Sequence, residues 1–141
     1  MKKKLAIIGT NGLPCRYGGW DNLMLNLLKE LGGSLEIEVY TSKSNSIPGI
    51  IKFMGAQIKI VPLRANGWQS VFYDGLSLLR SLPKNNYILV LGTSGAIFFP
   101  LKKFFTAKII LNPDGAEWKR GKWNLFIQKY LKFSERLSVF F

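Results

Sequence analysis

Residues 5–31 read LAIIGTNGLPCRYGGWDNLMLNLLKEL, and this stretch decides the fold. It begins with four apolar residues that stop at Gly9, which is typical of a strand buried on both faces of a parallel sheet. After a glycine-rich loop, large apolar residues recur at helical spacing until Gly32 and Gly33 end the pattern; they are Trp20, Leu23, Met24, Leu27, Leu28 and Leu31. The stretch predicts a strand, a loop and a helix.

The same alternation continues along the chain. We predict further strands over residues 35–40, 58–61, 87–91 and 108–111, helices over residues 68–79 and 96–105, and a long helix at the C-terminus. Residues 42–55 are predicted to be an irregular connection. Strands that alternate with helices specify right-handed crossovers and a parallel, doubly wound sheet. We therefore expect one Rossmann-like α/β domain over residues 1–141, with ligands at the loops after Ile8, Leu91 and Leu111.

The composition limits the partners and the compartment. The 20 basic residues outnumber the 8 acidic residues, and the net charge of +12 favours an anionic partner: a membrane surface, nucleic acid or a phosphorylated substrate. Nucleic acid is the least favoured of these, because no recognition motif accompanies the charge. Cys15 is the only cysteine and there is no histidine, so we predict a cytoplasmic chain without disulfide, metal site or cofactor.

Neither a secretion signal nor a membrane span is predicted. The apolar run that follows the basic N-terminus ends at Ile8, far short of a signal peptide. The longest uncharged stretch, residues 85–101, contains glycines, asparagines and Pro100, which suit a strand, a turn and a helix better than a transmembrane helix.

The first loop, residues 9–19, lacks the spacing of a dinucleotide-binding motif and the Gly-Lys-Ser/Thr of a P-loop. It does place Gly18 and Gly19 directly before a helix, where free backbone N–H groups and the helix dipole favour an anion. The alternative is that these glycines only form the turn between strand and helix.

Five segments together resemble one family. They are residues 7–14 (IIGTNGLP), 17–21 (YGGWD), 73–79 (YDGLSLL), 114–123 (DGAEWKRGKW) and 134–137 (SERL). In this order and spacing they resemble the N-terminal domain of bacterial retaining glycosyltransferases of family four, in particular a rhamnosyltransferase-like subgroup long described as a domain of unknown function. The chain departs from the usual motif of that subgroup at residues 20–22, where Trp-Asp-Asn replaces Phe-Glu-Thr.

The resemblance implies a GT-B architecture, in which two Rossmann-like domains face each other across a cleft. The acceptor binds mainly to the first domain and the nucleotide sugar mainly to the second. We expect the donor-binding C-terminal domain to be absent from this chain, which would then be a fragment or one subunit of a split enzyme, inactive on its own. The alternative is a non-catalytic basic domain that docks on a membrane or on another transferase.

The resemblance also assigns site residues. Gly18 and Gly19 would face the diphosphate of the donor, and Asp114 and Glu117 would contact or deprotonate an acceptor hydroxyl. The alternative for these two carboxylates is capping and pairing with Lys119 or Arg120. The hydroxyls of Thr93 and Ser94 would face the same cleft, or else cap the next helix. The remaining cleft residues are Asn11, Arg16, Tyr17, Trp118, Lys119 and Arg120.

The acceptors of the family are commonly sugars on a polyprenyl diphosphate carrier at the cytoplasmic face of the membrane. Basic residues among aromatic residues suit an anionic lipid surface, and we expect peripheral attachment to the inner face of the plasma membrane. The residues expected at the membrane are Phe98, Phe99, Lys102, Lys103, Lys129 and Lys132. The alternative for the last helix is a solvated basic side opposite a core-facing stripe made of Trp123, Phe126, Ile127, Tyr130 and Leu137.

Overall fold

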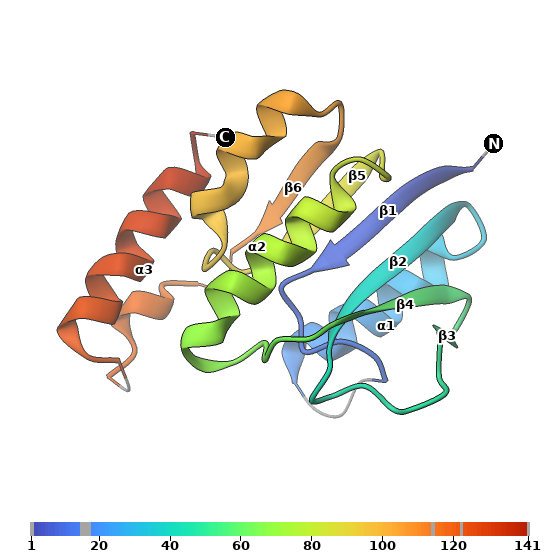
Figure 1. Cartoon of the computed structure of the whole chain (residues 1–141), viewed down its shortest axis with the longest axis horizontal. Helices are drawn as coiled ribbons and strands as arrows, with labels where there is room; N and C mark the ends of the chain where they lie inside the picture. The colour runs from blue at the N-terminus through green and yellow to red at the C-terminus, as the bar shows by residue number, and fades with distance from the viewer. Residues whose placement is uncertain (1, 15–17, 114, 122, 141) are drawn as a thin grey trace.

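The computed structural model describes residues 2–14, 18–113, 115–121 and 123–140, and its centre is a six-stranded sheet (Figure 1). The strands are β1 (Lys3–Ile8), β2 (Leu35–Ser42), β3 (Lys52–Phe53), β4 (Ala56–Val61), β5 (Tyr87–Leu91) and β6 (Lys108–Asn112). Their order is β3-β4-β2-β1-β5-β6, and all neighbours are parallel except the antiparallel pair β3 and β4. The predicted Rossmann-like α/β fold is confirmed.

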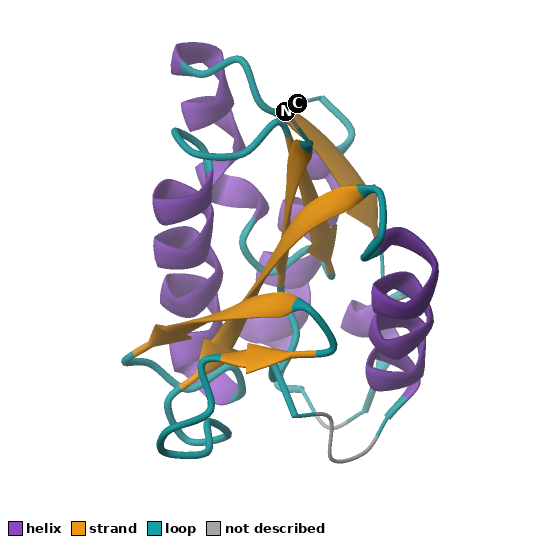
Figure 2. Ribbon diagram, turned by 90° about the vertical axis from the view of Figure 1, so that its right-hand side faces the viewer, coloured by secondary structure: helices purple, strands orange, loops and turns teal. Residues whose placement is uncertain are grey.

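Helices cover both faces of this sheet (Figure 2). Helix α1 (Gly19–Leu31) lies on one face, and α2 (Ser70–Ser81) lies on the other with the 3₁₀ helix η2 (Ala96–Phe104). Helix α3 (Leu125–Ser138) packs against η2 and against the short 3₁₀ helix η3 (Glu117–Lys119). One further 3₁₀ turn, η1 (Gly67–Gln69), leads into α2.

Strand β1 is the centre of the core. Leu5 and Ile7 belong to the apolar cluster under α1, whereas Ala6 and Ile8 belong to the cluster under α2 and η2. All four are at most 5% exposed, as predicted for a strand that is covered on both faces. Alternate residues of one short strand therefore hold both helical layers to the sheet.

The structure differs from the sequence prediction at two elements. The connection between β2 and β4 is not irregular throughout, because residues 52–53 and 56–57 form a small antiparallel hairpin. Its turn contains Met54 and Gly55, both with positive φ. The helix predicted over residues 96–105 is a 3₁₀ helix, and Pro100 lies inside it. Proline lacks the N–H that a regular α-helix needs at this point.

Within the described residues, no helix is both long and apolar enough to cross a membrane.

Candidate functional site

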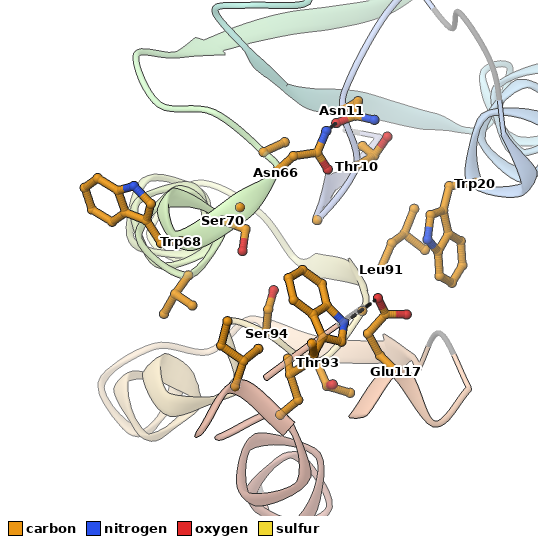
Figure 3. Close-up of a pocket in the computed structure, with 18 of the residues that line it drawn as sticks. Thr10, Asn11, Trp20, Asn66, Trp68, Ser70, Leu91, Thr93, Ser94 and Glu117 are labelled. Carbon is orange, nitrogen blue, oxygen red and sulfur yellow. Dashed lines mark hydrogen bonds between the residues drawn. The ribbon is translucent and has the colours of Figure 1, made fainter. Parts of the chain in front are cut away.

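A cleft of about 720 Å³ opens at the carboxyl edge of the sheet, where β1 and β5 end side by side (Figure 3). The chain leaves β1 for β2 and β4 on one side of the sheet and later returns to form β5 and β6 on the other. The loops after β1 and β5 therefore diverge, which leaves space between them. Ligands of doubly wound sheets bind at this kind of topological switch point.

The floor of the cleft is polar. Thr10 and Asn11 follow β1, Thr93 and Ser94 follow β5, and Asn66 precedes η1. The side-chain amide of Asn66 donates to Oδ1 of Asn11 over 3.1 Å, so the loops after β1 and β4 are joined at the edge of the cleft (Figure 3). Hydroxyl and amide groups that converge in this way are suited to fixing the orientation of a polar ligand.

The loop after β1 is held in place by Tyr73 of α2. The phenol hydroxyl of Tyr73 lies 2.9 Å from the carbonyl oxygen of Thr10 and 2.7 Å from that of Tyr40, and it can donate to either. Tyr73 is fully buried, and burial raises the pKa of its phenol above the ordinary value. This neutral anchor connects α2 with the ends of β1 and β2.

Helix α1 begins at the rim of the cleft. Its N-cap residue is Gly18, with φ 131°, and no side chain of the described residues caps the first turn. A β-carbon at Gly18 or Gly19 would meet none of the described atoms within 4 Å. A ligand could therefore approach the backbone of this helix start closely, and a helix N-terminus favours an anion.

Aromatic side chains form the walls. Trp20 and Trp68 lie on opposite sides of the cleft in Figure 3, and Trp68 is 77% exposed. Trp68 packs edge-on against Phe72, with ring centroids 6.3 Å apart. The wall contributed by the segment before α3 and by α3 itself contains Trp123, Phe126 and Tyr130. Flat apolar rings beside a polar floor suit a ligand with both apolar and hydroxyl-bearing faces, such as a sugar.

A buried carboxyl group lies next to the floor. Asp74 of α2 accepts a hydrogen bond from the hydroxyl of Ser94. Gly95 permits this approach, because a β-carbon there would lie 2.5 Å from the β-carbon of Asp74. Burial raises the pKa of Asp74 to about 7, against a smaller lowering effect of the Ser94 hydrogen bond.

Glu117 also lines the cleft, and its carboxylate is engaged. It pairs with the guanidinium of Arg120 at 3.0 Å and accepts from the indole N–H of Trp123 at 3.2 Å. This is the pairing that the sequence allowed as the alternative to a catalytic role. These two contacts of Glu117 connect η3 with Arg120 and with Trp123, which lies shortly before α3.

The structure brings together part of the predicted site. Asn11, Gly18, Thr93, Ser94, Glu117 and Arg120 all line the cleft, whereas Gly19, Trp118 and Lys119 do not. The indole of Trp118 instead lies between two ammonium groups, at 5.3 Å from Lys119 and 4.7 Å from Lys132. Arg16, Tyr17 and Asp114 lie outside the described residues. Neither hydroxyl of Thr93 and Ser94 caps η2, whose N-cap is Gly95 without a side-chain hydrogen bond.

The assignment of Phe99 to a membrane surface is wrong, whereas that of Phe98, which is half-buried, stays a prediction. Phe99 is 1% exposed in the core, and the ring of Phe98 packs in the space that Gly75 leaves open. The tight 3₁₀ turns carry these two rings toward α2 and leave Phe104 exposed instead. Of the lysines assigned with them, Lys102 is half-buried, while Lys103, Lys129 and Lys132 are exposed.

One side of α3 forms an exposed surface of aromatic, aliphatic and cationic residues, which we call the outer face of α3. Its members recur at spacings of three, four and seven residues, and all are exposed: Leu125, Phe126, Lys129, Lys132, Phe133, Arg136, Val139 and Phe140. The sequence alternative, in which Phe126 faces the core, is wrong for that residue, because Phe126 is 81% exposed.

Sequence reasoning missed several cleft residues. Asn66, Trp68 and Phe72 gave no local signal, because they reach the cleft only through the return of the chain from β4. Asp74, whose carboxyl group lies next to the floor, also has no predicted role, because its burial depends on the distant loop around Gly95.

The family model described as "Domain of unknown function (DUF1972)" matches residues 2–141. None of the curated proteins matches the chain. The family match spans every element that lines the cleft.

Proposed function

The chain belongs to the DUF1972 family, and from this premise we propose that it is the acceptor-binding half of a glycosyltransferase with a GT-B architecture. The complete enzyme would move a sugar from a nucleotide sugar to a lipid-linked or polysaccharide acceptor. Rhamnose is the donor sugar that the subgroup resemblance suggests. The donor-binding domain would come from a longer form of the protein or from a separate subunit.

The observation that carries this proposal is the cleft at the switch point between β1 and β5. It combines a polar floor, aromatic walls and the start of α1 at Gly18. A sugar hydroxyl can bond to the floor, a sugar ring can stack on an indole, and the diphosphate of a donor can approach the backbone N–H groups at the start of α1. One cleft therefore offers groups that suit a sugar hydroxyl, a sugar ring and a diphosphate.

The proposal gives the protein groups binding and orienting roles. Holding the acceptor hydroxyl beside the donor sugar converts an encounter of two substrates into a reaction within one complex. The N–H groups of Gly18 and of the first turn of α1 would stabilise the charge that develops on the departing diphosphate. Glu117, because it pairs with Arg120 and Trp123, shapes the wall next to this site.

The test is an NMR titration of the isotope-labelled chain with a water-soluble prenyl diphosphate disaccharide. The same titration is run with methyl glycosides of rhamnose, glucose and galactose. We expect shifts at the backbone amides of Gly18 and Ser94 and at the indole N–H of Trp68. An unchanged spectrum at millimolar concentrations of all these ligands would contradict the proposal. A parallel titration with a short RNA is expected to leave these cleft signals unshifted.

The outer face of α3 favours a second function, docking of a non-catalytic domain on an anionic membrane. Phe126, Phe133 and Phe140 alternate with Lys129 and Arg136 along this exposed surface. Such a surface can place rings between lipid headgroups and cations against their phosphates. The two functions are compatible, because a membrane-bound domain would meet a lipid-linked acceptor. If anionic vesicles without any glycan shift only signals of α3, and no glycan ligand shifts the signals of the cleft, the result would support membrane docking without sugar binding.

A further inference from the structure

We propose that Ser94 determines which ligand group the floor of the cleft recognises: its hydroxyl oxygen accepts a hydrogen bond from one hydroxyl group of the bound sugar. Asp74 is the positioning residue that makes this possible. The inference rests on the proposed function, since it assumes that the cleft binds a sugar. It adds that the protein acts as the hydrogen-bond acceptor at one subsite.

The hydroxyl hydrogen of Ser94 is already committed. It is donated to the carboxylate of Asp74, which lies behind the loop and is 7% exposed, whereas Ser94 itself lines the cleft (Figure 3). A serine hydroxyl has one hydrogen and two acceptor lone pairs. With the hydrogen directed at Asp74, only lone pairs remain for a ligand in the cleft.

The backbone at Ser94 is held by hydrogen bonds from α3, which fix the position from which its side chain reaches Asp74. The phenol of Tyr130 donates to the carbonyl oxygen of Ser94 over 2.7 Å. The hydroxyl of Ser134 donates to the carbonyl oxygen of Thr93 over 2.5 Å. Both donors come from α3, whereas Asp74 comes from α2. The loop is thus fixed between two helices, and the side chain of Ser94 has one oriented partner.

This arrangement selects by hydrogen-bond polarity. A sugar hydroxyl can donate to Ser94, whereas an ether, a fluorine or a phosphate oxygen cannot, and it would face lone pairs of the same sign. The subsite therefore fits a hydroxyl-bearing carbon of the acceptor and disfavours the diphosphate of either substrate. We expect phosphate to bind instead at the start of α1, on the rim of the cleft.

The test compares a methyl glycoside with its monodeoxyfluoro analogues, in which fluorine replaces one hydroxyl at a time and cannot donate. The glycoside that binds most tightly among those of rhamnose, glucose and galactose serves as the probe. Near pH 8, where Asp74 is mostly ionised, we expect fluorine at one ring position to weaken binding about 5- to 10-fold. We call the dissociation constant of this fluoro analogue divided by that of the parent glycoside the ratio. In Ser94→Ala the ratio should fall to about one, because the accepting oxygen is gone.

Asp74→Ala tests the positioning role. Without the carboxylate the Ser94 hydroxyl can rotate and donate, so the ratio between parent and fluoro analogue should also collapse. A merely structural role of Asp74 would weaken both ligands alike and preserve the ratio. Ser46→Ala, which removes a hydroxyl from a half-buried side chain outside the cleft lining, is the matched control and should retain the wild-type ratio.

The outcomes separate the two proposals. If the glycosides bind and the ratio survives in Ser94→Ala, the inference is wrong while the proposed function stands. If the wild-type chain binds none of the glycosides, the proposed function fails and the inference fails with it. If Asp74→Ala does not fold, Ser94→Ala still decides, because this half-buried side chain loses only one oxygen.

Discussion

A methyl group at Gly9 would lie 2.1 Å from the carbonyl oxygen of Leu91, so the ends of β1 and β5 approach each other as closely as only glycine permits. Gly9 also has φ +84°, which side chains rarely adopt. Gly9 and Leu91 both line the cleft, so this tight contact forms part of its wall.

Gly9→Ala should destabilise the fold by about 2 kcal/mol or more, because the new β-carbon meets backbone that cannot easily move and the residue keeps a strained φ. Urea unfolding followed by circular dichroism measures this loss. Gly33→Ala is the control, since a β-carbon there meets none of the described atoms within 4 Å, and it should stay within about 0.5 kcal/mol of wild type. Equal effects of the two substitutions would contradict the importance of the Gly9 contact.

Five strands of the sheet could be predicted, because each contains a short apolar or alternating run bounded by glycine, proline or polar residues. The two-residue strand β3 carries no such pattern. The position of the cleft followed from the alternation of strands and helices. What periodicity cannot determine is which side of an irregular or 3₁₀ element faces inward. For this reason Phe99 was assigned to the surface although it lies in the core.

The buried carboxyl group could not be predicted for a related reason. Asp74 is buried by η2 and the loop around Gly95, which are about twenty residues away in sequence. Similarly, Trp68 and Asn66 join the site only when the chain returns from β4 to begin α2. Local sequence predicted the elements, whereas the composition of the cleft depends on contacts between them.

Glu117→Gln should change glycoside affinity less than about twofold, because the amide oxygen can still accept from Trp123 and the lost ion pair is partly exposed. NMR titration measures the affinity. Glu117→Ala removes the acceptor altogether, which frees the indole, and should weaken binding more than the Gln variant does. A large loss in Glu117→Gln would instead indicate that the negative charge itself contacts the ligand.

Trp68→Ala should weaken binding of the best glycoside about 3- to 10-fold, because a stacking surface is removed from the wall. Stability should change by less than about 0.5 kcal/mol, since the ring is 77% exposed. The matched control is Ile51→Ala, which removes a side chain that is 72% exposed and does not line the cleft. The prediction is wrong if both variants bind as wild type does.

The combined substitutions Phe126→Ser and Phe133→Ser should reduce sedimentation of the chain with anionic liposomes several-fold, because both rings protrude from the outer face of α3. Binding of the wild type should also weaken as salt rises, since the cations of this face are exposed. Phe104→Ser, at a ring that is equally exposed but lies on η2, is the control. Equal losses in the two proteins would place the membrane contact elsewhere.

Asp74→Asn should become more stable relative to wild type as pH rises from about 4 to about 7. The ordinary pKa of an aspartate carboxyl group is 3.8, and burial raises that of Asp74 to about 7 in the fold because it disfavours the charge. Below this window the carboxyl group is protonated in both the folded and the unfolded chain, so its titration does not lower the free energy of unfolding. Within it the unfolded chain releases the proton and the folded chain retains it, so wild-type stability falls, by at most about 4 kcal/mol, and then levels off.

The other titratable groups that interact with Asp74 do not obscure this dependence. They are the phenols of Tyr73 and Tyr130, whose pKa values are raised by burial, so both remain neutral throughout the window. Ser94→Ala provides a control of opposite sign: it removes the hydrogen bond that lowers the pKa of Asp74, so the loss of stability should extend to higher pH and become larger in total. Thermal unfolding of the three proteins across the pH range measures both effects. A constant stability difference between wild type and Asp74→Asn would show that the pKa of Asp74 is the same in the folded and the unfolded chain, which would contradict the prediction.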